Sequence, residues 1–295
     1  MTVTPRDRAP PALRIATCRP LPEPDVDEDL LLQALAARGV AARMAAWRDP
    51  AERWDEPVPT VVRSTWDYIH DVEAFRAWIR AASAAAPLWN PAGVMLDNLH
   101  KGYLVALAAR GVPVVPTALQ RRGDPATLSA LAAARGWCDV VVKPAVGAGS
   151  HETHRVPDAP AGGGDDLLAR LAARQDMLVQ PYLRAVEGYG ERALVFIDGE
   201  FTHAVRKAPR FAGGVEEVSA ALPITAAERA VGEAALAPCR GELLYGRVDV
   251  APGPDGEPVV MELELVEPSL FLLQEPRALA RLADAIAVRL AGAGS

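Results

Sequence analysis

Residues 245–251 read YGRVDVA and residues 258–266 read PVVMELELV, and these two stretches decide the fold of the C-terminal part of the chain. Both are rich in β-branched residues, and the Pro-, Gly- and Asp-rich segment between them predicts a β-hairpin. Residues two apart on a strand share a face, so the second stretch places Glu262 and Glu264 together with an apolar stripe behind them. Pairing of the two strands would add Asp249 to this acidic face.

The three carboxylates of Asp249, Glu262 and Glu264 repel one another unless protons or cations compensate their charge. Carboxylate oxygens are hard ligands that suit Mg²⁺, which usually takes a few carboxylates together with substrate phosphates. The pattern therefore predicts a magnesium site. A half-exposed hairpin with an acidic outer face would show the same alternation, and that alternative stays open at this point.

The rest of the C-terminal half also favours antiparallel strands with helices. Residues 193–197 and 201–206 flank an Asp-Gly dipeptide, which is typical of tight hairpins. The spacing of apolar residues predicts helices over residues 225–237 and 275–290. This half of the chain is therefore predicted to be α+β.

The first hundred residues have a different organisation. Strands and helices alternate along them, which predicts a small parallel α/β layer. We expect Asp27 to cap the first helix and Gly39 to end it. The other predicted elements are strands over residues 14–18, 40–47 and 60–66 and a helix over residues 72–85.

The middle of the chain mixes both patterns. A helix is predicted over residues 97–110, and Asp124 is expected to cap another over residues 125–135. Residues 139–144 form a β-branched strand that ends at a Lys-Pro pair. A helix over residues 167–175 and a strand over residues 177–182 complete this region.

Two lysines and a glycine-rich segment are candidates for binding phosphate. Lys143 precedes residues 146–150, which read VGAGS, and such small residues let backbone N–H groups approach an anion. The segment is not a Walker A loop, because no Gly-Lys-Ser/Thr follows it. Lys101 shares a face of its predicted helix with Asn98. A plain connecting loop and a solvated helix lysine are the alternatives.

An apolar strand enters a loop at residues 178–183, which read LVQPYL. Such a segment can present backbone groups to the edge of an adenine, and Glu187 and Glu191 follow at a spacing that can reach ribose hydroxyls. Taken alone, this is a strand that leaves a sheet.

The order of these signals resembles the ATP-grasp superfamily of carboxylate–amine ligases, over residues 14–290. A smaller branch is indicated by RSTWDY at 63–68, WNP at 89–91, HAVRK at 203–207 and ELELVEPSL at 262–270. That branch contains the O-ureido-D-serine cyclo-ligase of D-cycloserine biosynthesis and is similar to glutathione synthetases. Many superfamily members have asparagine where Glu264 stands.

The resemblance implies an ATP-grasp fold in the α/β class, in which a small parallel layer precedes two lobes that sandwich the nucleotide. It implies a disordered tail over residues 1–12, a substrate domain over 13–95, a lid domain over 96–178 and a metal-binding domain over 179–295.

The resemblance also implies roles for the site residues, with ATP and Mg²⁺ as cofactors. Phosphate binding falls to Lys101, Lys143, Gly147, Gly149 and Ser150. Adenine binding falls to Gln180, Pro181, Tyr182 and Leu183, and ribose binding to Glu187 or Glu191. Arg206, Lys207 and Arg247 would neutralise the transferring phosphoryl group, and Asp249, Glu262 and Glu264 would hold the metal.

Substrate recognition is predicted at the carboxyl ends of the first strands, where α/β sheets place their ligands. We expect Arg19 and Arg63 to bind a substrate carboxylate and Asp67 an amine. The wider candidate set is Cys18, Arg19, Arg63, Ser64, Thr65 and Asp67. The alternative for each is an ordinary surface-loop residue. Cys18 has no flanking signature of a nucleophile.

The implied activity is an ATP-dependent ligase that phosphorylates a small amino-acid-like substrate, after which a nitrogen displaces the phosphate. Ring closure within one molecule, of the O-ureido-D-serine type, is one version. The alternatives are an intermolecular peptide ligase of the glutathione-synthetase or D-Ala–D-Ala type, and a nucleotide-binding relative that has lost catalysis.

Composition limits the other classes. The chain has 295 residues and a formal net charge of −7, which argues against general nucleic-acid binding. No apolar run reaches the length of about 20 residues that a membrane span needs. Three widely spaced cysteines form no zinc or disulfide pattern, and His151 and His154 lack the spacing of a zinc helix. We expect a cytoplasmic homo-oligomer, either a dimer or a tetramer.

Overall fold

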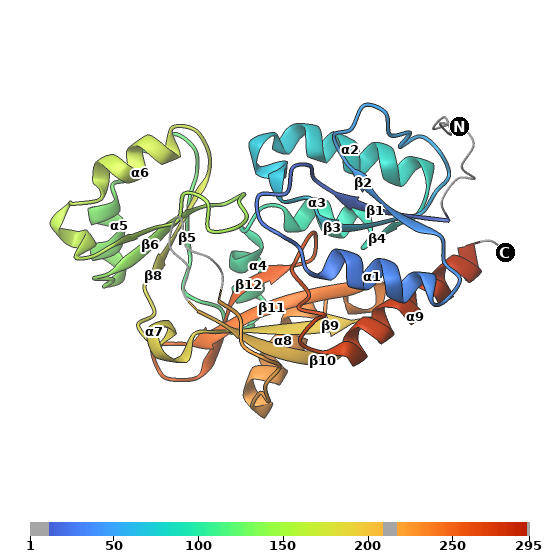
Figure 1. Cartoon of the computed structure of the whole chain (residues 1–295). Helices are drawn as coiled ribbons and strands as arrows, with labels where there is room; N and C mark the ends of the chain where they lie inside the picture. Colours follow the sequence, from blue (N-terminus) through green and yellow to red (C-terminus); the bar gives the residue numbers. More distant parts are fainter. Residues whose placement is uncertain (1–11, 209–216, 294–295) are drawn as a thin grey trace.

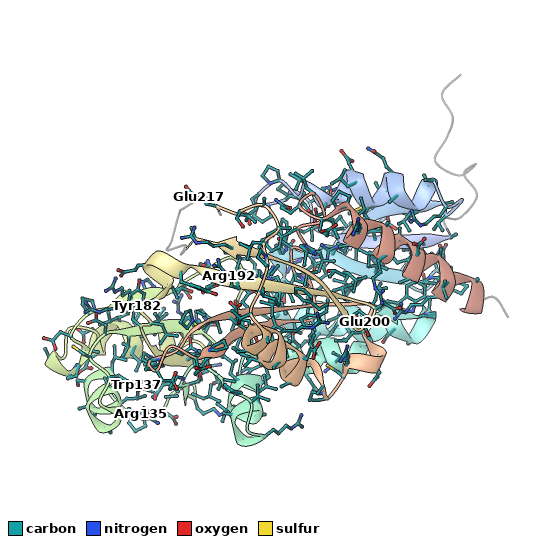
Figure 2. All side chains as sticks on the ribbon, turned by 90° about the horizontal axis from the view of Figure 1, so that it is seen from below. Arg135, Trp137, Tyr182, Arg192, Glu200 and Glu217 are labelled. Atoms are coloured by element: carbon teal, nitrogen blue, oxygen red, sulfur yellow. The ribbon has the colours of Figure 1, made fainter. Side chains whose placement is uncertain are left out.

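Three four-stranded sheets make up the chain in this computed structural model, which describes residues 12–208 and 217–293 (Figure 1). The predicted tail, residues 1–12, lies outside the described residues except for Ala12. Side chains fill the spaces between the ribbons (Figure 2). No helix in the described ranges combines the length and apolar character needed to cross a membrane.

The N-terminal sheet is parallel, as predicted, with the order β2-β1-β3-β4. Its strands are β1 (Leu13–Thr17), β2 (Ala42–Ala46), β3 (Thr60–Ser64) and β4 (Leu88–Trp89). Its helices are α1 (Asp27–Ala36), α2 (Val72–Ala85) and α3 (Ala92–Asn98). A 3-10 turn, η1 (Trp66–His70), follows β3.

Asp27 does not cap α1, contrary to the prediction. It is the first residue of the helix, and its buried carboxylate accepts hydrogen bonds from the backbone N–H groups of Leu272 and Leu273, at 3.0 and 3.4 Å. The carboxylate therefore satisfies a distant loop of the C-terminal region rather than its own helix, a use that a local pattern does not reveal.

The central sheet is antiparallel in the order β5-β8-β6-β7. Its strands are β5 (Ala118–Gln120), β6 (Val140–Pro144), β7 (His154–Val156) and β8 (Met177–Pro181). Helices α5 (Leu128–Arg135) and α6 (Asp165–Ala172) pack on it through one apolar cluster. The N-cap of α5 is Thr127 and not Asp124, because the Thr127 hydroxyl accepts from the backbone N–H of Ala130.

The C-terminal sheet is antiparallel in the order β10-β9-β11-β12. Its strands are β9 (Glu191–Ile197), β10 (Glu200–Lys207), β11 (Tyr245–Pro252) and β12 (Pro258–Glu264). Helices α7 (Val186–Tyr189), α8 (Ala226–Leu236) and α9 (Pro276–Ala293) accompany it. Asp198 and Gly199 have φ angles of 52° and 74°, so the predicted hairpin turn lies where the Asp-Gly pair occurs.

The helix predicted over residues 97–110 is broken. Its parts are α3, which ends at Asn98, and α4 (Tyr103–Ala109). Lys101 lies in the turn between them, where its backbone N–H donates to the carbonyl of Ala145 at 2.6 Å. A contact with the central sheet therefore replaces the helical hydrogen bond, and Lys101 and Asn98 do not share a continuous helix.

Asn90 joins the N-terminal and C-terminal sheets. Its amide nitrogen donates to the carbonyls of Tyr245 and Leu265, both at 2.8 Å, and its amide oxygen accepts from the N–H of Leu244 at 2.7 Å. The side chain is fully buried, so these hydrogen bonds are costly to lose. Helix α9 packs beside α1 in the same region (Figure 1).

Candidate active site

A cavity of about 780 Å³ lies where the three sheets meet. Its lining includes the β1–α1 loop, η1, the ends of β6 and β8, the glycine-rich segment after β6, and one face of β11 and β12. Every sheet therefore contributes to a single cavity. Its size is in the range of small-molecule sites.

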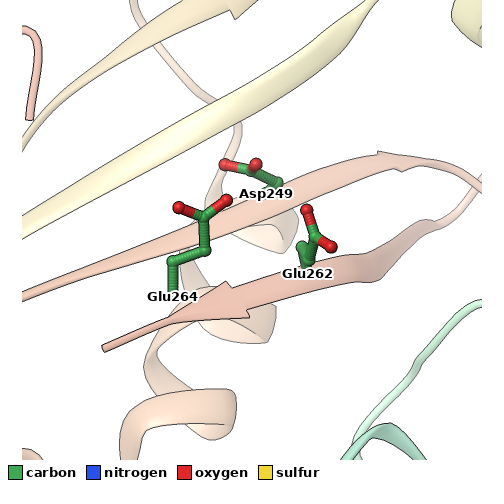
Figure 3. A group of neighbouring side chains, drawn as sticks. All are labelled: Asp249, Glu262 and Glu264. Atoms are coloured by element: carbon green, nitrogen blue, oxygen red, sulfur yellow. The ribbon is translucent and has the colours of Figure 1, made fainter. Parts of the chain in front are cut away.

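The predicted acidic face exists: Glu262 and Glu264 line this cavity, whereas Asp249 is fully buried beside them and is not among the described lining residues. Ligand oxygens of Asp249, Glu262 and Glu264 lie within 4.8 Å of one another (Figure 3). Asp249 and Glu262 are direct partners across β11 and β12, and Glu264 is two residues further along the same strand face. The hairpin register thus brings together three acids that the sequence separates.

Four cationic side chains surround the three acids. Arg247 donates from Nε to Asp249 at 2.9 Å and also binds Glu264. Lys207 donates to Asp249 at 2.5 Å. On the opposite side, the Nζ atoms of Lys101 and Lys143 lie 3.2 and 3.7 Å from the same oxygen of Glu262. Lysines from two other regions therefore converge on the hairpin.

Burial and neighbouring charges shift the pKa values of these acids in different directions. Burial alone would raise the pKa of Glu262, but Lys101 and Lys143 lower it far below its ordinary value. Arg247 and Lys207 likewise overcome burial and lower the pKa of Asp249. Burial raises the pKa of Glu264 to about 7, and the charges of Asp249 and Glu262 add to this effect against Arg247. The ion pair with Arg247 therefore does not offset burial and the two neighbouring carboxylates at Glu264.

A divalent cation fits this donor set. The three carboxylates offer only hard oxygen atoms, close enough to share one ion or two, which is the chemistry that Mg²⁺ prefers. Burial is the largest cause of the raised pKa of Glu264, and repulsion from Asp249 and Glu262 adds to it. A bound cation would relieve that repulsion.

The glycine-rich segment lies beside the two lysines. Gly147, Gly149 and Ser150 all line the cavity, and Lys101 Nζ donates to the carbonyl of Gly147 at 2.5 Å. Gly149 and Ser150 have φ angles of 58° and 59°, a left-handed conformation that glycine adopts without strain. The turn thus holds its backbone against the cationic side of the cavity.

Gln180, Pro181, Tyr182 and Leu183 line the cavity at the end of β8, where an adenine was predicted. Glu191 also lines it, and its carboxylate lies 3.3 Å from Lys207 Nζ. Glu187 does not line it among the described residues. Instead it accepts from Arg155 at 3.0 Å and from the Tyr182 hydroxyl at 2.9 Å.

Sequence comparison places the chain in a family. Residues 13–90 match the profile described as D-cycloserine synthetase DcsG, N-terminal domain. The chain is 34% identical over 286 residues to the cycloserine biosynthesis protein DcsG of Streptomyces lavendulae, which covers 90% of this chain and 94% of that protein. The chain belongs to the DcsG family.

Solved structures show that the DcsG family has the ATP-grasp fold. The crystal structure of D-cycloserine synthetase DcsG matches with a TM-score of 0.86 and 34% identity, over 94% of this chain and 99% of that one. The ATP-grasp ligase PsnB, solved with a minimal precursor, Mg and ADP, matches with a TM-score of 0.63 and 18% identity, over 95% and 97%. The predicted resemblance and fold class are confirmed, and the chain is an ATP-grasp ligase.

Arg206 and Lys207 are neighbours on β10, so they point to opposite faces of the sheet. Lys207 lines the cavity of this DcsG-family chain, whereas Arg206 binds the carbonyls of Tyr189 and Gly188, both at 3.0 Å. Arg206 is thus not among the described residues that line the cavity, and its role at the transferring phosphoryl group stays a prediction.

Most of the predicted substrate residues lie behind the cavity wall. Of that set, only Asp67 is among the described lining residues, and it accepts a hydrogen bond from Trp47 Nε1 at 2.6 Å. Arg63 is buried, donates to the carbonyl of Pro268 at 2.9 Å and lies over the ring of Tyr245. The residues of the set that do not line the cavity are Cys18, Arg19, Arg63, Ser64 and Thr65.

Several lining residues were given no role in the sequence analysis, among them Glu267, Tyr68 and Tyr103. Glu267 follows β12, and burial, with the charge of Glu264, raises its pKa to about 8. The hydroxyl of Tyr68 in η1 hydrogen-bonds to Glu267, and the Tyr103 hydroxyl accepts from the N–H of Leu263 at 3.0 Å. Glu267 lies beyond the alternating strand, so the two-residue period that identifies Glu262 and Glu264 does not reach it.

Proposed function

We propose that this DcsG-family ligase is an ATP- and Mg²⁺-dependent cyclo-ligase that acts on a small amino-acid-like substrate of the O-ureido-D-serine type. The observation that carries the proposal is the convergence of Lys101 and Lys143 on Glu262, beside the three-carboxylate cluster, in one cavity. The identity to a cycloserine biosynthesis protein supports the substrate class.

The residues around the cavity support a division of labour. Lys101, Lys143 and the backbone of the glycine-rich segment would bind the phosphates of ATP, and residues 180–183 would bind adenine. Asp249, Glu262 and Glu264 would hold Mg²⁺, which when bound supplies positive charge to the phosphates. Arg247 and Lys207 would orient the γ-phosphoryl group and screen its charge.

The chemistry then takes two steps. A carboxylate oxygen of the substrate bonds to the γ-phosphorus while the bond from that phosphorus to the β–γ bridging oxygen breaks, and ADP leaves. The substrate nitrogen next bonds to the acyl carbon, the carbon–oxygen bond to phosphate breaks, and the nitrogen loses its proton. Such an acyl phosphate needs protection from water, which a cavity enclosed by three sheets favours.

Asp67 is the residue that we propose for binding the substrate amine, because it is an acid of η1 in the N-terminal layer that lines the cavity. We further propose the predicted domain boundaries, 13–95 for the substrate domain, 96–178 for the lid and 179–295 for the metal-binding domain. A cytoplasmic homo-oligomer remains part of the proposal.

The test is ADP release by the purified protein with D- and L-amino acids, dipeptides and O-ureidoserine, with and without Mg²⁺, and with mass analysis of the products. We expect Mg²⁺-dependent ADP formation with O-ureidoserine and a cyclic product. A linear, two-substrate product would identify an intermolecular peptide ligase instead. Nucleotide binding without ADP release across the whole panel would contradict catalysis.

A further inference from the structure

The loop between β1 and α1 forms one wall of the cavity. Pro20, Leu21, Pro22 and Glu23 all line it, and we call residues 20–23 the β1–α1 wall. With Pro24, three of five consecutive residues are prolines, which have no backbone N–H to donate. A segment of this composition donates few backbone hydrogen bonds of its own, so side chains contribute to holding its position.

A buried carboxylate anchors the first end of this wall. Glu28, in the first turn of α1, accepts through Oε1 from the hydroxyls of Thr17 and Ser64, at 2.8 and 2.7 Å. Its Oε2 accepts from Arg19 at 2.8 Å. The Arg19 guanidinium also donates to the Thr17 hydroxyl at 2.8 Å and to the carbonyl of Cys18 at 2.9 Å. Glu28 thus ties β1, β3 and the residue before the wall to one point.

The second end of the wall is held from the same helix turn. The carboxylate of Asp25 accepts from the N–H of Asp27 at 3.0 Å, and the Asp27 carboxylate in turn accepts from Leu272. The loop that contains the wall is therefore bonded on both sides, by the Asp25 carboxylate at the start of α1 and by the Arg19–Glu28 ion pair before the wall.

Glu28 is a charged group in a nearly closed environment. Its side chain is 11% exposed. Although burial would raise its pKa, hydrogen bonds from Arg19, Ser64 and Thr17 lower it overall, so the carboxylate is ionised. Among the described residues, neither Glu28 nor its partners Thr17, Arg19 and Ser64 lines the cavity. Arg19 directly precedes the wall in the chain, and the Glu28 carboxylate binds its guanidinium.

We propose that Glu28 is a positioning residue, which fixes the β1–α1 wall so that the cavity accepts the substrate that is to be phosphorylated. This inference rests on the proposed function of the cavity. It also gives a role to Arg19 and Ser64, which were expected to bind substrate directly. They support the surface that meets it.

Glu28→Gln and Arg19→Met test the proposal in steady-state ADP-release assays. We expect each to raise the KM for the acceptor substrate by roughly 10-fold and to leave the KM for ATP within about 2-fold of wild type. Because both variants release the same anchor, the double variant should raise it no further than the larger single effect. Independent, multiplying effects would mean that Glu28 acts elsewhere and would overturn the proposal.

Glu52→Gln is the matched control. Arg43 and Glu52 form an ion pair in the same sheet layer, with side-chain exposures of 41% and 13%, against 45% and 11% for Arg19 and Glu28. Glu52 does not line the cavity within the described ranges. A similar rise of acceptor KM in Glu52→Gln would show a general loss of stability and would count against the proposal.

Amide hydrogen exchange separates this inference from the proposed function. Exchange over residues 18–28 should be faster in Glu28→Gln and Arg19→Met than in wild type and in Glu52→Gln, with or without turnover. Wild-type protein that releases no ADP contradicts the proposed function alone. Unchanged exchange over residues 18–28 contradicts the positioning role alone. The Arg19 side chain is 45% exposed, so we expect Arg19→Met to fold, and it keeps the proposal testable if Glu28→Gln does not fold.

Discussion

Two parts of the cavity lining, the hairpin with its cations and the segments from the N-terminal layer, differ in charge. At the hairpin, Lys101, Lys143, Lys207 and Arg247 meet three carboxylates, and each cation has an acidic partner there. The lining from the N-terminal layer, residues 20–23 and 66–70, touches the segment after the hairpin through the Tyr68–Glu267 hydrogen bond, and it includes acids, aromatic rings and a histidine but no lysine or arginine. From this difference we expect the anionic groups of both substrates to bind beside the hairpin cations and a cationic amine to bind beside the N-terminal lining.

The largest effect should come from removing the charge that organises the hairpin. We expect Glu262→Gln to lower ADP formation by about 10³-fold, because this carboxylate faces both lysines and the predicted metal. ADP release measures it. Glu257→Gln, in the exposed turn of the same hairpin, is the control and should match wild type. Turnover of Glu262→Gln close to wild type would contradict the role of this carboxylate in ADP formation.

The lining from the N-terminal layer is tested by Asp67→Asn. Loss of a charged hydrogen bond to an amine should raise the acceptor KM by roughly 10- to 100-fold and leave the ATP KM unchanged. The amide oxygen can still accept from Trp47, so the local packing is kept. Asp55→Asn, on an exposed surface of the same layer, serves as the control. An increase in the ATP KM instead would show that the two parts of the lining are not separate.

The next prediction concerns which of two glutamates contacts the ribose of ATP. Because Glu191 lines the cavity and Glu187 is engaged by Arg155, Glu191→Gln should raise the ATP KM by about 10-fold. Glu187→Gln should change it by no more than about 3-fold. Initial rates at varied ATP measure both. The reverse order would assign the ribose contact to Glu187.

The smallest effect concerns stability in metal-free buffer. Glu264 has a pKa of about 7, above the ordinary value of 4.5, so the folded protein holds more protons than the unfolded chain between these values. Its contribution to the free energy of unfolding is therefore present at low pH and is lost as pH rises from about 4.5 to about 7. Wild type should lose a few degrees of melting temperature relative to Glu264→Gln across this range. A difference that grows in the opposite direction would contradict the charge crowding.

Much of the fold follows from short-range sequence patterns. The hairpin acids were found because strand alternation has a fixed period of two, and α2 was found from its apolar spacing with the same bounds, residues 72–85. The order of the lysines and the hairpin along the chain then led to the resemblance to the ATP-grasp superfamily. Local rules identified these elements because each buries one face.

Long-range contacts explain the rest. Asp27 binds a loop some 245 residues away, and the backbone of Lys101 pairs with Ala145, which breaks a helix that local spacing favours. Arg19 and Arg63 have the charge that a substrate carboxylate requires, but Glu28 and the carbonyl of Pro268 already bind them. No pattern within a single segment reports what occupies a guanidinium in the folded protein.

The buried Asn90 amide has a consequence for motion. Its hydrogen bonds to the backbone of Leu244, Tyr245 and Leu265 connect the N-terminal sheet to the C-terminal sheet. We therefore expect these two sheets to move together, and the central sheet, which carries Lys143, to move when nucleotide enters. With Asn90 in place, we expect the central sheet to be the part that moves relative to the other two.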